Sequence, residues 1–320
     1  MHKRRRHTIF TSLTVVVLAP LFVSAPASAA EEELAERLSF ALDSVPAEHL
    51  VDFANVESLA AEMAAGEPLE VLTPAGEATG VSITEVAVDG PGAIVSLSAG
   101  RKAVTRSSGS YTTAQQKSDG SVQIITMIES AASPTEYSFD LTLPQGAYLE
   151  LTQDGSVIAY GAGGEFVAGV HKPWAVDANN EPVPTHFTIT GNRLTQVVSH
   201  DQDDAFPVVA DPWLGADLYG RVNATSVSEG YVLTTTPTAW GAGFSGPTQV
   251  SMWWAHADEV KNKVPRGYGW SLSLQEQLYC HIAGWPVSAN PSYDLESWKP
   301  HVRWDLQIPS KCLGGYSPGS

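Results

Sequence analysis

The residues best suited to chemistry lie near the C-terminal end of the chain. His281 directly follows Cys280, and Glu296 lies in the segment after it. An imidazole and a carboxylate within hydrogen-bond reach can act as a general acid–base pair, so His281 and Glu296 are the candidate catalytic residues of a hydrolase. In the alternative interpretation His281 packs beside a disulfide and binds a backbone carbonyl. Glu296 then forms a salt bridge with Lys299 or Arg303.

Aromatic residues in the same region suggest a binding surface. Seven of the nine tryptophans follow residue 214, and Trp298 and Trp304 are among them. An indole face suits the C–H groups of a sugar ring, so these two residues are the candidate ligand contacts. Tryptophan is also the largest apolar side chain, and it can fill the core of a small domain instead.

The first thirty residues have the pattern of a secretory signal peptide. A basic start at Lys3–Arg6 precedes an apolar run from Ile9 to Val23, and small residues lead to an A-x-A site at Ala27–Ala29. We therefore expect a secreted protein, extracellular or associated with the cell envelope. After signal removal we expect no integral membrane span, because no later stretch is apolar enough.

The two cysteines, Cys280 and Cys312, both follow the signal segment. In an oxidising compartment they are expected to form a disulfide. The chain-entropy estimate gives such a crosslink about 3–4 kcal/mol of stabilisation. The alternative is two separate thiols, one of them a nucleophile beside His281.

Charge limits the classes of partner. The chain has 18 Lys and Arg against 35 Asp and Glu, a net charge of −17. Nucleic acid is excluded as an expected partner because phosphate binding needs clustered positive charge. A cell-wall glycan or an extracellular protein is expected instead.

The sequence predicts neither a cofactor nor a metal site. It contains no H-E-x-x-H pattern. The acidic group Asp201, Asp203 and Asp204 lacks the glycine and the distal glutamate of a calcium loop.

Three zones follow the signal segment. Residues 31–70 are acidic with a helical pattern, and residues 71–213 show short strand-like runs separated by turns, which favours an all-β, sandwich-like module. Residues 214–320 are predicted to form a small, disulfide-closed α+β domain. In it we expect helices over 250–264 and 273–283, the second with Ser273 as N-cap and Glu276 in a capping box. A closing strand is expected over 301–308, so the overall class is β-rich and mixed.

The C-terminal zone resembles the DUF2599 family of secreted actinobacterial proteins. The resemblance covers roughly residues 230–315 and rests on Leu274–Gln277, Cys280-His281, Tyr293–Trp298 with Lys299-Pro300, and the later Trp304 and Cys312. It implies a disulfide-closed domain and brings no assigned activity. We expect a non-enzymatic protein that binds or presents at the cell envelope or outside the cell. The alternative is a secreted hydrolase using His281 and Glu296.

Overall fold

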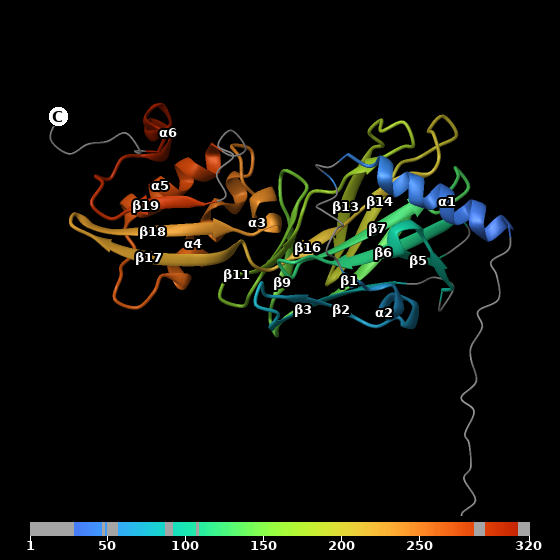
Figure 1. Ribbon diagram of the computed structural model, residues 1–320, viewed down its shortest axis with the longest axis horizontal. Helices are drawn as coiled ribbons and strands as arrows, with labels where there is room; N and C mark the ends of the chain where they lie inside the picture. The colour runs from blue at the N-terminus through green and yellow to red at the C-terminus, as the bar shows by residue number, and fades with distance from the viewer. Residues whose placement is uncertain are drawn as a thin grey trace, which may run out of the picture.

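The computed structural model describes residues 29–46, 49, 57–86, 92–106, 109–284 and 292–312. The expected signal peptide lies outside these residues, apart from its last two positions. A β-rich module and a smaller C-terminal module lie end to end along the long axis (Figure 1). Among the described residues, no helix is long and apolar enough to cross a bilayer.

The β module contains two sheets whose described strands all pair antiparallel. The strands of the larger sheet are β1 (Glu57–Ser58), β4 (Ile94–Ser96), β5 (Lys102–Thr105), β6 (Ser110–Gln116), β7 (Val122–Ile128), β9 (Tyr148–Leu151), β10 (Val157–Tyr160), β11 (Phe166–Val170), β12 (Ala175–Val176), β15 (Val208–Ala210) and β16 (Trp213–Gly215). Its main path runs β4-β5-β6-β7-β16-β11-β10-β9, while β1 pairs with β6, β15 with β7, and β12 with β15.

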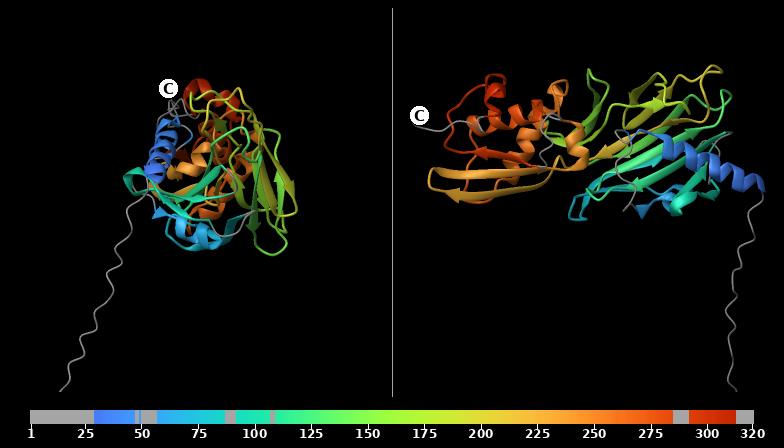
Figure 2. Two further views of the ribbon diagram at one scale, coloured as in Figure 1. Left: turned by 90° about the vertical axis from the view of Figure 1, so that its right-hand side faces the viewer. Right: turned by 45° about the horizontal axis from the view of Figure 1, so that its top comes forward.

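The second sheet has the order β13-β14-β8-β3-β2. Its strands are β2 (Leu69–Leu72), β3 (Ala78–Glu85), β8 (Glu136–Thr142), β13 (Thr185–Thr190) and β14 (Arg193–Val198). Apolar side chains from both sheets share one core, in which Val81 and Phe139 of the smaller sheet meet Ile124 and Val157 of the larger one. The sandwich-like module predicted from the sequence is therefore confirmed (Figure 2).

The N-terminal helices belong to this module. Helix α1 (Ala29–Ser44) covers the outer face of the larger sheet, where its Leu38 and Leu42 meet Ile125 and Met127 of β7. The alternate β7 residues face the sandwich core, so this strand is buried on both faces. The short α2 (Ala60–Ala65) packs on the sandwich core, and η2 (Ser98–Gly100) precedes β5.

The C-terminal module has one three-stranded sheet with helices packed on it. Its strands, in the order β17-β18-β19, are β17 (Tyr219–Val227), β18 (Gly230–Pro237) and β19 (Tyr293–Glu296). Its helices are α3 (Ala239–Gly243), η3 (Val250–Met252), α4 (Trp253–Lys263), α5 (Leu272–Ala283), α6 (Trp304–Gln307) and η4 (Ile308–Ser310).

Two sequence expectations for this module are wrong in detail. The alternation over 301–308 does not form a strand but gives α6 and η4, and Leu306 and Ile308 are exposed. The edge of β19 that a further strand could pair with is occupied by the side-chain amide of Gln277. The N-cap of α5 is Ser271, whose hydroxyl accepts from the Leu274 amide.

Candidate binding site

The predicted acid–base residues lie at and beside β19, an edge strand of the small sheet. Its side chains alternate: Tyr293 and Leu295 are buried, while Asp294 and Glu296 are on the more exposed face. Helix α5 packs along this strand and carries His281 in its last turn. Glu296 therefore lies on β19 and His281 on the helix packed against it. The hydrolase interpretation requires in addition that the two side chains contact each other.

Their contacts serve the backbone of β19. On α5, Gln277 donates to the carbonyl of Glu296 over 3.1 Å and accepts from its amide over 2.8 Å. One helical turn later, His281 hydrogen-bonds the backbone of Asp294 and stacks on Tyr293 at 5.1 Å. The two α5 side chains thus take the place of a fourth strand. Burial lowers the pKa of His281, which keeps the ring neutral at neutral pH.

The Glu296 carboxylate lies near Lys299, 3.8 Å from its ammonium. Burial raises the pKa of Glu296, and the nearby Lys299 opposes that rise. Arg303 pairs instead with Asp305. Within the described part of the chain, no hydrogen bond or ion pair joins Glu296 to His281. The two residues therefore lie at the same strand but contact different partners, the backbone of Asp294 for His281 and the ammonium of Lys299 for Glu296.

The disulfide Cys280–Cys312 is confirmed, with the two Cα atoms 5.5 Å apart. It joins the end of α5 to the turn after η4. The two tryptophans predicted to contact a ligand, Trp298 and Trp304, have different surroundings. Trp304 packs edge-on against Trp253 at 4.7 Å, and Trp298 lies half-buried on the turn after β19.

A hollow of about 530 Å³ lies at the junction of the two modules. It is lined by three aromatic rings, a glycine-rich turn and several polar side chains: Gly163, Gly164, Glu165, Trp254, Ala257, Asp258, Lys261, Trp270, Gln275 and Tyr279. The first three belong to the turn between β10 and β11, and the others to the C-terminal module. Pockets for small ligands commonly have volumes of about 300–1,000 Å³, so the hollow is of suitable size.

Helix α4 supplies one wall of the hollow. Trp254, Ala257, Asp258 and Lys261 follow the i, i+3, i+4, i+7 spacing that places residues on one helical face. Trp253 points away from this face and is buried. The adjacent tryptophans thus take different roles, as their angular separation on a helix requires.

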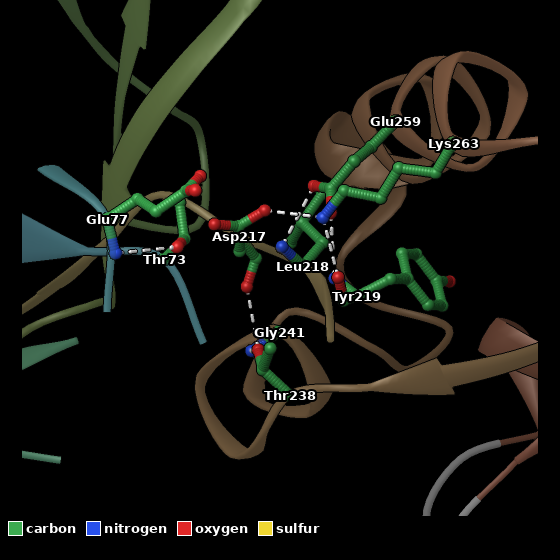
Figure 3. A network of polar contacts seen from close by, with 9 residues as sticks. All are labelled: Thr73, Glu77, Asp217, Leu218, Tyr219, Thr238, Gly241, Glu259 and Lys263. Carbon is green, nitrogen blue, oxygen red and sulfur yellow. Dashed lines mark hydrogen bonds and ion pairs between the residues drawn. The ribbon is translucent and has the colours of Figure 1, made fainter. Parts of the chain in front are cut away.

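A polar network holds α4 against the chain that leaves the β module (Figure 3). The Glu259 carboxylate accepts from the backbone amides of Leu218 and Tyr219, both over 2.8 Å. Lys263, one turn further along α4, forms ion pairs with Glu259 and Asp217 and donates to the Tyr219 carbonyl. Because these contacts lie on another face of α4, they orient the lining residues without entering the hollow.

Aromatic rings from both modules pack together at the junction. His171 of the β module stacks on Trp213 at 4.9 Å and on Phe244 at 4.0 Å, and its Nε2 donates to the Trp240 carbonyl. The Trp240 amide in turn donates to the Asp119 carboxylate over 2.8 Å. Burial lowers the pKa of His171 to about 4. The ring is therefore a neutral packing element between the modules.

The described residues give no support for a metal site, since no group of three or more His, Cys, Asp or Glu among them is arranged to hold an ion. In the acidic loop, the carboxylates of Asp204 and Asp201 accept from the backbone amides of Asp201 and Asp203. These side chains act as turn caps.

Compared with known proteins, the chain matches no protein-family model and shows no significant similarity to a curated protein. The DUF2599 resemblance therefore stays a prediction.

The hollow was not predicted from the sequence. The spacing of Trp254, Asp258 and Lys261 signals a shared helical face, and this signal was available. The Gly163–Glu165 turn is about ninety residues earlier in the chain, and only the packing of the modules brings it to the same place.

Proposed function

We propose that this protein is exported and acts at the cell envelope or outside the cell as a non-enzymatic binding protein. The β module presents the C-terminal module, and the ligand occupies the hollow at their junction. The expected partner is a cell-wall glycan or an extracellular protein, and neither a nucleic acid nor a cofactor is required.

The observation that carries this proposal is the difference between two places in the C-terminal module. The hollow combines three aromatic rings with polar groups and has space for a ligand. His281 and Glu296 instead hold or flank the edge of β19, where the ring is neutral and engaged with backbone. A surface that recognises a partner needs aromatic and polar groups around an open space, as in the hollow. Hydrolysis by an acid–base pair needs His281 and Glu296 to lie within hydrogen-bond reach of each other.

Export is supported by the basic, apolar and small-residue pattern of residues 1–30 and by the disulfide. Disulfides persist in oxidising compartments and are rare in the cytosol.

Cosedimentation of the oxidised chain, residues 31–320, with insoluble bacterial cell walls tests the proposal. We expect the protein to pellet with the walls. The double variant Trp254→Ala/Trp270→Ala should stay in the supernatant, while the control Trp298→Ala should pellet like the parent chain. Soluble sugars or peptides are measured in the same tubes. Release that depends on His281 and Glu296 would establish the hydrolase instead.

A further inference from the structure

We propose that the junction hollow is a saccharide-binding site built jointly by the two modules. This inference rests on the proposed binding function and names the chemical class of its ligand. Three features of the described residues support it: the aromatic rings, the mixture of donors and acceptors, and the exposed backbone of the glycine-rich turn.

Two of the three lining rings, Trp254 of α4 and Tyr279 of α5, are held in place by neighbouring rings. Tyr160 of β10 stacks on Trp254 at 5.6 Å with an interplanar angle of 9°, so the β module fixes the orientation of this indole. Tyr148 extends the stack at 5.5 Å. Tyr279 of α5 packs against the buried Trp253 at 5.5 Å. Rings with fixed planes can receive the C–H faces of a pyranose without losing much conformational freedom.

The hydrogen bonding of the indole N–H group distinguishes Trp254 and Trp270 from the buried tryptophans. Trp213 donates to Ser121 over 2.8 Å, Trp253 to the Gly246 carbonyl over 3.3 Å, and Trp240 to the Trp213 carbonyl over 3.4 Å. Within the described part of the chain, Trp254 and Trp270 make no such bond. Buried indoles generally find a partner, whereas these two can donate to a ligand hydroxyl.

The polar groups of the hollow are of both kinds. Lys261 donates, Asp258 accepts, and the amide of Gln275 does both. A hydroxyl group also donates and accepts, so a polyhydroxylated ligand can satisfy all of these groups. An anionic ligand would meet the carboxylates of Asp258 and Glu165 on a chain of net charge −17. A cationic ligand would be attracted by these two carboxylates and repelled by Lys261, so tetramethylammonium is the comparison ligand that tests this alternative.

The contribution of the β module is mainly backbone. The Glu165 carboxylate folds back over its own turn and accepts from the Gly163 amide over 3.0 Å. Gly164 has a φ of +84°, a conformation that favours glycine. Because Gly164 carries no side chain and no atom of the described residues beyond its chain neighbours lies within 4 Å of the position its Cβ would take, a ligand ring can approach the turn closely there. Both modules are therefore needed to complete the site.

Titration of the intact oxidised chain, residues 31–320, tests the inference. The probes are short soluble oligomers of glucose, galactose, arabinose and N-acetylglucosamine. Tetramethylammonium and inorganic phosphate serve as charged comparison ligands. Binding is followed by tryptophan fluorescence and calorimetry. We expect at least one oligosaccharide to bind and neither charged comparison ligand to bind.

Removal of a lining group should weaken this binding by about tenfold, as loss of a central contact residue does. The variants are Trp270→Ala and Gln275→Ala, with Trp298→Ala as a control that keeps full affinity. Trp254→Phe retains a ring against Tyr160 and should lose less affinity than Trp254→Ala. Circular dichroism shows whether each variant is folded.

The outcomes separate this inference from the proposed function. Cell-wall binding without affinity for any oligosaccharide, unchanged in Trp270→Ala, would overturn the saccharide site and leave the binding function standing. Binding of tetramethylammonium or phosphate in place of sugars would also overturn it. Binding followed by cleavage of the oligosaccharide would support the site but overturn the non-enzymatic function.

Discussion

The β module and the C-terminal module achieve a packed core in different ways. The sandwich core contains three aromatic residues, Tyr137, Phe139 and Phe187, among 26 buried positions. The core of the C-terminal module and its junction contains six among 18. The first core is therefore built from many small aliphatic contacts between long strand ladders, and the second depends on a few large rings.

The same difference appears at the sheet edges. In the β module, β7 has strand partners on both sides and apolar cover on both faces. In the C-terminal module, β19 has one strand partner, and Gln277 and His281 replace the other. Small domains bury a lower fraction of their surface and need additional constraints. Here the disulfide and the β module itself provide them.

The largest effect is expected from Trp240→Ala, because this ring connects the modules. Trp240 is fully buried and lies edge-on to His171 at 5.7 Å and to Phe244 at 4.9 Å. Removing a buried tryptophan costs about 3–5 kcal/mol. Urea unfolding followed by near-ultraviolet circular dichroism measures the loss. A cost below about 1 kcal/mol, equal to that of the half-buried Trp298→Phe, would show that the modules do not depend on this junction.

The second largest loss of stability is expected when the Cys280–Cys312 disulfide is removed. Replacing both cysteines, Cys280→Ser and Cys312→Ser, opens a loop with a sequence separation of 32 and should lower the free energy of unfolding by about 3–4 kcal/mol. We expect the tryptophan signals of the C-terminal module to be lost at lower urea than the far-ultraviolet signal of the sandwich. Titration of the untreated chain should find no reactive thiol. Two reactive thiols would remove the constraint on which the comparison rests.

Acid should affect the junction histidines and the sandwich interior in opposite directions. Burial lowers the pKa of His171, at the junction, and of His256, beside Tyr219, to about 4. Between about pH 6.5 and 4 the unfolded chain binds protons that the folded rings refuse, so stability falls as the pH falls. At pH 5.5 each ring should cost about 1 kcal/mol.

For Asp211 in the sandwich, the contribution to stability changes with pH in the opposite direction. Burial raises its pKa to about 8, so between pH 3.8 and 8 the folded state holds a proton that the unfolded state releases. The contribution of Asp211 to the stability of the folded protein therefore falls as the pH rises. NMR titration of the histidine rings and urea unfolding at pH 7 and 5.5 check both signs. A junction that becomes more stable at pH 5.5 would contradict the assignment.

The sequence predicted the sandwich better than the C-terminal module, for a physical reason. Strand β8 alternates between buried and exposed side chains, and this period identifies a half-buried strand directly. Strand β6 lacks this alternation, because the polar residues Thr112 and Thr113 are both buried. Thr112 donates to the buried Glu85 carboxylate over 2.9 Å, a partner far away in sequence.

In the C-terminal module the decisive contacts are side chain to backbone. The alternation of 301–308 matched a strand, but only the fold shows that Gln277 already fills the edge of β19. The same holds for the binding site. The α4 face can be read from its spacing, whereas the contribution of Gly163 and Gly164 depends on how two modules pack.

The smallest effect is expected at the predicted acid–base pair, and a neighbouring variant sharpens its meaning. Glu296→Gln removes a charge whose nearest cation, Lys299, is 3.8 Å away. We expect it to change the free energy of unfolding by less than about 1 kcal/mol. The matched variant Gln277→Ala leaves the amide and carbonyl of the same residue without their partner, which should cost about 1–3 kcal/mol. Urea unfolding compares the two. If Glu296→Gln were the more damaging, or if it abolished turnover of a cell-wall substrate, the carboxylate and not the strand edge would be the functional feature of this segment.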